Sequence, residues 1–185
     1  NIDFRGKAIT VRSAEGPATC IIDCQQQGRG FVFQTAETPD SVLEGVTIQN
    51  GLADFGGGIE CDNASPTIQN CVIRDCQAEF GAGIDCYYAA PTITGCVIQG
   101  NMALKVREYQ GQVVHTGQGG GIESCGATIP GNVSPIIFNC LIVDNISAQY
   151  GSAVNIFQSS APQISFCTIA GNQVEDDLYG AAIRA

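Results

Sequence analysis

The feature that most constrains the fold is a repeat of about 25 residues, in which the same residue types return to the same places. Residues 56–80 read GGGIECDNASPTIQNCVIRDCQAEF, and residues 81–105 read GAGIDCYYAAPTITGCVIQGNMALK. A fixed period of this length is typical of a solenoid, in which each repeat is one small structural unit that stacks on its neighbours.

Four kinds of position recur. They are an aliphatic residue after small residues, a proline before a short apolar pair, a cysteine two residues before an isoleucine, and a residue three places beyond that isoleucine. These positions are, in turn, Ile59, Ile84, Ile122, Val154 and Ile183; Pro66, Pro91, Pro135 and Pro162; Cys71, Cys96, Cys140 and Cys167; and Cys76, Asn101, Asn145 and Asn172.

Each repeat contains three short runs with apolar residues two apart, which is the period of a β-strand. Gly, Asn, Asp and Pro between the runs supply turns. The pattern predicts an all-β fold: a single-stranded, right-handed parallel β-helix of about six rungs, with three short strands per rung. The handedness follows the usual chirality of parallel crossovers. We expect one domain over residues 1–185, with insertions at 102–118 and 126–133.

Stacked rungs place equivalent residues in columns about 4.8 Å apart. We expect interior columns of aliphatic residues and of cysteines, and a ladder of inward amides at Asn101, Asn145 and Asn172. The ten cysteines leave two alternatives open. They are reduced core residues, or some form disulfides between rungs. The candidates for disulfides near turns are Cys20, Cys24, Cys61, Cys76, Cys86 and Cys125.

The motifs Gly-Gly-Gly-Ile (56–59), Gly-Ala-Gly-Ile (81–84) and Gly-Ser-Ala-Val (151–154), with the later Ile-x-x-Asn motifs, resemble the GGA[ILV] and FxxN repeats of polymorphic outer membrane proteins. More broadly, the chain resembles right-handed parallel β-helix repeat proteins of bacterial and archaeal cell surfaces. The resemblance implies a solenoid that is extracellular or on the cell surface.

Function in a solenoid lies on outward positions and in insertions. Glu60, Asp85 and Glu123 follow the aliphatic column on three successive rungs. Like charges at this spacing repel, and a ligand or a Ca²⁺ ion would offset the repulsion. Retaining glycosidases also use a carboxyl pair at about 5 Å. The remaining alternative is a solvated acidic face, so we assign no catalytic residue.

Two further features are candidate contact surfaces. The insertion at 102–118 contains Tyr109 and His115, which are candidates for ligand binding. An aromatic column lies four residues before the aliphatic one, where it could cover a corner of the core or bind sugar rings. Its members are Phe55, Phe80, Tyr150 and Tyr179, with Gln118 interrupting it.

Three sequons begin at Asn63, Asn132 and Asn145. We expect Asn63 and Asn132 to lie in loops that could carry glycans, and Asn145 to be buried and bare.

The two ends of the sequence fall at the same position of the repeat and lack a polar cap. Two alternatives explain this: the sequence is a fragment of a longer solenoid, or copies of the chain stack end to end. For the second we expect an interface formed by Ile2, Asp3, Phe4, Ile183 and Arg184. A head-to-tail contact of this kind generates filaments.

The net charge of −10 argues against nucleic acid as a partner, and no apolar run approaches the length of a membrane span. The first prediction is therefore an extracellular structural protein that stacks into a filament. The alternative is a protein that binds or cleaves carbohydrate. Because pectate lyases and polygalacturonases are also β-helices, an enzyme of this kind would be a polysaccharide lyase or a glycoside hydrolase.

Overall fold

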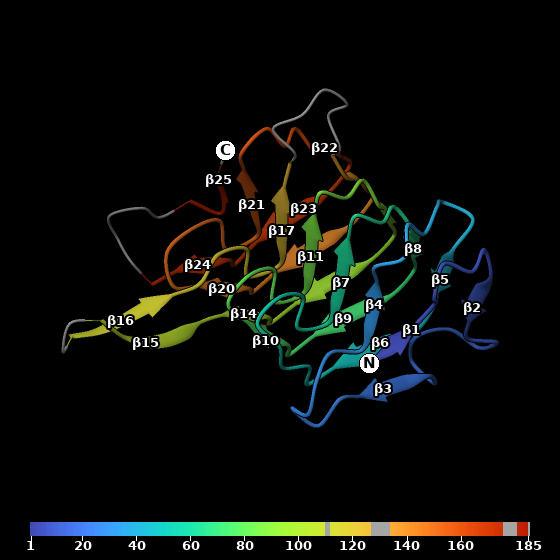
Figure 1. The fold of residues 1–185 in the computed structure, drawn as a ribbon, viewed down its shortest axis with the longest axis horizontal. Helices are drawn as coiled ribbons and strands as arrows, with labels where there is room; N and C mark the ends of the chain where they lie inside the picture. The colour runs from blue at the N-terminus through green and yellow to red at the C-terminus, as the bar shows by residue number, and fades with distance from the viewer. Residues whose placement is uncertain (110–111, 127–133, 176–180, 185) are drawn as a thin grey trace.

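The computed structural model describes residues 1–109, 112–126, 134–175 and 181–184, with the backbone alone described for 105–109 and 112–115. The chain winds through about six rungs, and each strand pairs in parallel with the equivalent strand of the next rung (Figure 1). The predicted right-handed parallel β-helix with three strands per rung is confirmed. In the described ranges, no helix is long and apolar enough to cross a membrane.

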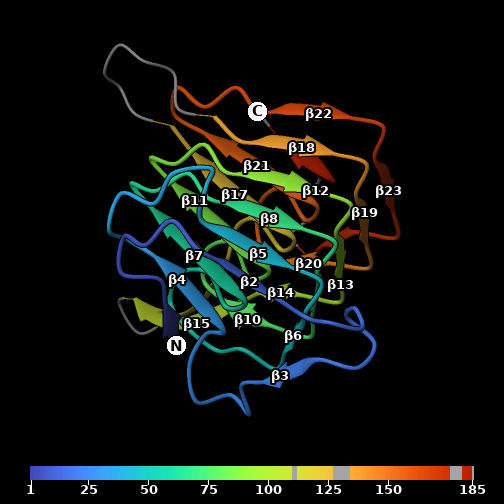
Figure 2. The same ribbon diagram turned by 90° about the vertical axis from the view of Figure 1, so that its right-hand side faces the viewer.

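Three stacked sheets form the faces of the coil. Sheet A consists of β1 (Ile2–Asp3), β4 (Phe31–Phe33), β7 (Ile59–Asp62), β11 (Ile84–Tyr87), β17 (Ile122–Cys125), β21 (Val154–Phe157) and β25 (Ile183–Arg184). Sheet B, which faces the viewer in Figure 2, consists of β2 (Thr10–Arg12), β5 (Val42–Glu44), β8 (Thr67–Gln69), β12 (Thr92–Thr94), β18 (Ile136–Phe138) and β22 (Gln163–Ser165). Sheet C consists of β3 (Ile21–Asp23), β6 (Thr47–Gln49), β9 (Val72–Arg74), β13 (Val97–Gln99), β19 (Leu141–Val143) and β23 (Thr168–Ala170).

Two smaller sheets add to the three expected strands. A fourth, short sheet lies after sheet C and consists of β10 (Gln77–Ala78), β14 (Met102–Ala103), β20 (Ile146–Ser147) and β24 (Gln173–Val174). The predicted insertion at 102–118 continues from β14 into an antiparallel hairpin of β15 (Lys105–Tyr109) and β16 (Gln112–Thr116), which projects from the coil in Figure 1. Most of the second predicted insertion, 127–133, lies outside the described residues.

The interior columns are confirmed by the strand register. Ile84 pairs with Ile59 on one side and with Ile122 on the other, and all three side chains are fully buried. Burying an aliphatic side chain stabilises a fold by about 1.5–3 kcal/mol. Because the same residue type recurs on each rung, the column forms one continuous core.

The predicted asparagine ladder is also confirmed. The amide Nδ2 of Asn101 donates to Oδ1 of Asn145 at 3.0 Å, and Nδ2 of Asn145 donates to Oδ1 of Asn172 at 2.9 Å. Each Oδ1 also accepts the backbone N–H of the neighbouring asparagine. Asn101 and Asn145 have no exposed surface, so their amides satisfy a turn that water does not reach.

All ten cysteines are free thiols in the structure. Cys71, Cys96 and Cys140 form the predicted buried column, and each Sγ donates to a backbone carbonyl at 3.6–3.7 Å. The structure therefore favours the reduced alternative over disulfides between rungs.

The residues expected at a stacking interface differ in their environments. Ile2 and Ile183 are 44% and 41% exposed, whereas Phe4 is 2% exposed and packs edge-on against Phe31. Phe4 therefore has almost no surface left to offer a second copy, and the interface stays a prediction that depends on the more exposed residues. The side chain of Arg184 lies over the ring of Tyr150, 3.5 Å from its centroid, which is a contact within the chain.

Candidate functional site

The outer face of sheet A carries three parallel columns of side chains, which run along the axis of the coil. We call the space between them the sheet-A groove. Its floor consists of Glu60, Asp85, Glu123 and Asn155; its first wall consists of Phe55, Phe80, Gln118 and Tyr150; and its second wall consists of Asp62, Tyr87, Cys125 and Phe157.

A left-handed turn at glycine places the first wall beside the floor. Gly81, directly after Phe80, has φ +57°, a conformation that strains residues with a Cβ. A Cβ at this position would lie 2.5 Å from the carbonyl oxygen of Ile84. The turn folds the ring of Phe80 back toward the outer face of β11, where Asp85 lies. Gly56, Gly119 and Gly151 repeat the positive φ on their own rungs, so the recurring Gly-x-Gly/Ala motif serves the groove as well as the coil.

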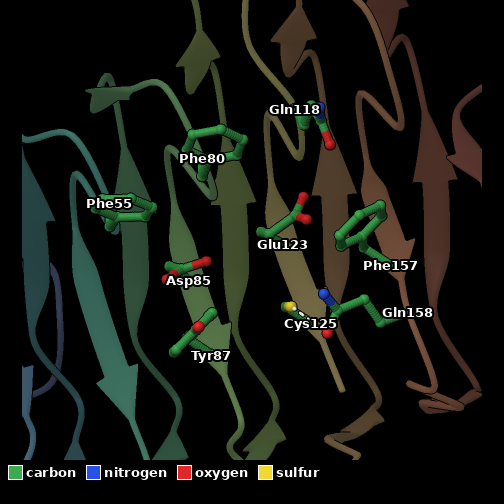
Figure 3. A pocket seen from close by; sticks show the side chains of 9 residues that line it. All are labelled: Phe55, Phe80, Asp85, Tyr87, Gln118, Glu123, Cys125, Phe157 and Gln158. Carbon is green, nitrogen blue, oxygen red and sulfur yellow. Dashed lines mark hydrogen bonds between the residues drawn. The ribbon is translucent and has the colours of Figure 1, made fainter. Parts of the chain in front are cut away.

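The carboxyl groups on the floor are buried, so the expectation of a solvated acidic face was wrong for two of the three. Asp85 is 2% exposed and Glu123 is 4% exposed. Oδ2 of Asp85 and Oε2 of Glu123 have no hydrogen-bond partner. Figure 3 shows both carboxyls between the row of Phe55, Phe80 and Gln118 and the row that begins with Tyr87 and Cys125.

Burial changes the protonation of both groups. Burial, followed by the negative charges of Glu123 and Glu60, raises the pKa of Asp85 well above its usual value. Burial also raises the pKa of Glu123 to about 8, although the hydrogen bond from Asn155 acts in the opposite direction. In the empty groove both shifts favour the protonated form of the carboxyl.

Glu60 has a different environment. Its Oε2 forms an ion pair with Nη1 of Arg29 at 2.6 Å, and Nη2 of Arg29 donates to the carbonyl oxygen of Phe55 at 2.9 Å. Burial raises the pKa of Glu60, and the positive charge of Arg29 opposes that shift. Arg29 thus bounds the groove at one end, as Arg184 over Tyr150 bounds it at the other.

The groove encloses a cavity of about 310 Å³. The rings of Phe55 and Phe80 lie parallel in its first wall, with centroids 5.3 Å apart and an interplanar angle of 14°. Opposite them lie Tyr87 and Phe157, both partly exposed to the cavity. A concave site with apolar walls and a few polar groups is the usual form of a ligand pocket.

The structure thus brings Glu60, Asp85 and Glu123 together on adjacent strands, as the sequence predicts. Among the described residues, however, no group of three His, Cys, Asp or Glu side chains is arranged to hold a metal ion. Glu60 is engaged with Arg29 instead. The three carboxylates therefore do not converge as the expected calcium site.

The other predicted site residues lie elsewhere. Tyr109 and His115 are on the projecting hairpin, where Tyr109 pairs with Gln112 and His115 with Val106, and their side chains lie outside the described part. Asn63 is exposed at a turn and remains a predicted glycosylation position. Asn132 and Tyr179 lie outside the described residues. Asn145 is fully buried in the ladder, as expected.

The sequence analysis missed the second wall and Arg29. Tyr87 lies two residues after Asp85, and Cys125 lies two residues after Glu123. Residues two apart on a strand share a face, so this spacing was a usable signal. Arg29 occupies the middle position of Gly28-Arg29-Gly30, which is in register with Gly56-Gly57-Gly58, so its place in the repeat was a usable signal as well.

In a comparison with known protein families, a family model described as a right handed beta helix region matches residues 3–123, which is more than half of the chain. A comparison with curated proteins found no match, and neither did a comparison with solved structures.

Proposed function

The chain belongs to the family of right-handed beta-helix proteins, and from that premise we propose that it binds a carbohydrate chain along the sheet-A groove. The observation that carries this proposal is the pair of parallel rings, Phe55 and Phe80, beside the buried carboxyls of Asp85 and Glu123. The apolar face of a sugar ring packs on an aromatic face, while its hydroxyl groups need buried polar partners.

The geometry of the groove suits a linear polymer. The first wall, the floor and the second wall each have a member on successive rungs. Successive sugar units would therefore contact similar side chains along the axis. Gln118 and Asn155 extend the polar contacts beyond Glu123, and the two amides already bond each other at 3.1 Å. The groove therefore offers hydrogen-bond donors and acceptors as well as apolar faces.

The protonation of the carboxyls favours binding over cleavage. A retaining glycosidase needs one ionised carboxylate as nucleophile beside one protonated acid. Burial raises the pKa values of both Asp85 and Glu123, which disfavours the ionised partner in the empty groove. A binding site has no such requirement, because a protonated carboxyl both donates and accepts hydrogen bonds.

The proposal includes the extracellular or cell-surface location expected from the sequence, with the coil as the scaffold that presents the groove. End-to-end stacking is a separate part of it. Electron microscopy and sedimentation at high protein concentration test that part, because a population of isolated monomers alone would contradict filament formation.

Titration calorimetry against oligosaccharides tests the groove. We expect Phe55→Ala with Phe80→Ala to weaken binding by about tenfold or more, since aromatic contacts contribute about 1 kcal/mol each. The matched control is Phe138→Ala with Phe166→Ala, an exposed ring pair with the same centroid distance of 5.3 Å that does not line the groove. Equal affinity of both double variants for every oligosaccharide would contradict the proposal.

A further inference from the structure

The floor of the sheet-A groove contains two buried acceptor atoms that nothing in the chain satisfies. Oδ2 of Asp85 and Oε2 of Glu123 are inaccessible and lack hydrogen-bond partners, and the two residues are direct neighbours across β11 and β17. A buried polar atom without a partner costs about 1–3 kcal/mol. Two such atoms side by side, facing one cavity, indicate a ligand that supplies donors to both.

Neither carboxyl of this pair forms an ion pair with a described side chain. Arg29, whose charge also acts on Asp85, is paired with Glu60, and Arg74 is paired with Asp75. Arg184, at the far end of the groove, contacts the ring of Tyr150. A positive charge on a ligand would therefore interact most favourably with the central part of the floor, between Asp85 and Glu123.

The walls suit an organic cation better than a metal ion. Four of the lining residues, Phe55, Phe80, Tyr87 and Phe157, present aromatic rings, and no three His, Cys, Asp or Glu side chains of the described residues are arranged to hold a metal ion. An ammonium group within about 6 Å of an aromatic face gains cation–π attraction. Its three N–H donors also match the two orphan carboxyl oxygens.

We propose that the ligand of the sheet-A groove is a cationic amino sugar, whose ammonium group lies between Asp85 and Glu123 while its ring packs on Phe55 and Phe80. This inference rests on the proposed function and names the class of carbohydrate. Uronic acids are disfavoured, because their negative charge opposes the ionisation of the two carboxyls that an ammonium group favours. Neutral and N-acetylated sugars leave the carboxyl pair without a cation.

Binding of an ammonium group changes the protonation of the floor. The carboxyls ionise as the cation arrives, and the released protons pass to the buffer. The charged groups that face Asp85 are Glu123, Glu60, Asp62 and Arg29. Around Glu123 lie Asp85, the amide of Asn155, and the thiol of Cys125, whose raised pKa of about 11 keeps it neutral.

The test compares a glucosamine hexamer with its fully N-acetylated counterpart of the same linkage, by titration calorimetry at pH 7. We expect the glucosamine hexamer to bind at least about tenfold more tightly. Titration in buffers of different ionisation enthalpy should show release of about one proton per ammonium bound, and none for the acetylated hexamer. This comparison uses the wild-type protein, so it stands even if a variant fails to fold.

Variants separate the groove from the general attraction of an acidic protein for cations. Asp85→Asn with Glu123→Gln should abolish both the preference and the proton release. Asp40→Asn with Glu44→Gln makes the same two carboxyl-to-amide substitutions at residues that do not line the groove, and should change neither. An equal loss in the two double variants would overturn the inference, because binding would then follow net charge.

Two other results also overturn it and can be told apart. If the acetylated or a neutral glucose hexamer binds as tightly as the glucosamine hexamer, the carbohydrate function stands and the ammonium site is wrong. If no hexamer binds but spermidine or a lysine-rich peptide does, the carbohydrate function falls, and with it the assignment of an amino sugar.

Discussion

Nδ2 of Asn155 donates a hydrogen bond of 3.0 Å to Oε1 of Glu123 across β21 and β17, while Oε2 of the same carboxyl has no partner. The bond fixes the orientation of a side chain that is 4% exposed. Oε1 of Glu123 is thus bound within the coil, whereas Oε2 is available to a ligand in the groove.

This half-satisfied carboxyl makes the stability of the protein depend on pH. The pKa of Glu123 rises from its usual value of 4.5 to about 8 in the folded state. Between these pH values the folded state binds more protons than the unfolded state, so the free energy of unfolding falls as pH rises and levels off above about 8. The stabilisation is complete below pH 4.5.

We expect Glu123→Gln to flatten this fall, because glutamine keeps an acceptor for Asn155 and cannot ionise. The variant should match the wild type near pH 4 and exceed it at pH 9 by up to a few kcal/mol, at about 1.4 kcal/mol per unit of pKa difference. Urea denaturation at pH 4 to 9 measures the effect. Glu44→Gln, on sheet B, is the control, and its free energy of unfolding should change with pH as that of the wild type does. The same pH dependence for Glu123→Gln would refute the prediction.

The turn glycines give a second prediction. Alanine at Gly81 must adopt φ +57° and place its Cβ 2.5 Å from the backbone oxygen of Ile84, so the backbone has to move. At Gly16 the φ is +87°, but no atom lies within 4 Å of a Cβ. We expect Gly16→Ala to cost about 1 kcal/mol, the price of the left-handed conformation alone, and Gly81→Ala at least twice as much.

Urea denaturation compares the two glycine variants directly. Gly81→Ala should also weaken oligosaccharide binding, because Phe80 precedes the turn, whereas Gly16→Ala should leave binding unchanged. Equal losses of stability would show that the close approach to Ile84 contributes nothing.

The coil could be predicted from the sequence because each rung repeats the same residue types. Ile59, Ile84 and Ile122 recur after small residues, and parallel stacking requires equivalent positions to pair. The aromatic column at Phe80 and the acidic column at Asp85 were each visible too. The sequence did not predict that the two columns line one groove. Whether an outward carboxyl is buried depends on how far a glycine turn folds the preceding ring over the sheet. That distance depends on the backbone conformation and cannot be read from the spacing of residues.

The asparagine ladder gives a third prediction. Asn145→Ala removes donations from Nδ2 to the carbonyl oxygen of Ile98 and to Asn172, and leaves the N–H of Asn101 buried without its acceptor. Each buried group left unpaired costs about 1–3 kcal/mol. We expect a loss of about 3 kcal/mol or more in the free energy of unfolding, measured by urea denaturation.

Gln99→Ala is the control for the ladder, because it removes an exposed amide from the outer side of the preceding rung. Its effect should stay within about 0.5 kcal/mol. A similarly small effect for Asn145→Ala would mean that water replaces the lost bonds and that the ladder does not stabilise the coil.

The cysteines give the last prediction, which concerns their reactivity. Burial raises the pKa values of Cys61 and Cys86 well above 9.0, and both are fully buried. Because the thiolate is the reactive form, these two should resist iodoacetamide at pH 8 in the native protein. Cys20, Cys24 and Cys167 are partly exposed and should be alkylated first. Peptide mass spectrometry after timed labelling follows each site, and labelling in urea provides the rate for the unfolded chain. Alkylation of Cys61 in the native state at the unfolded rate would contradict the packing of this column, and a disulfide-linked peptide from the untreated protein would contradict the reduced core.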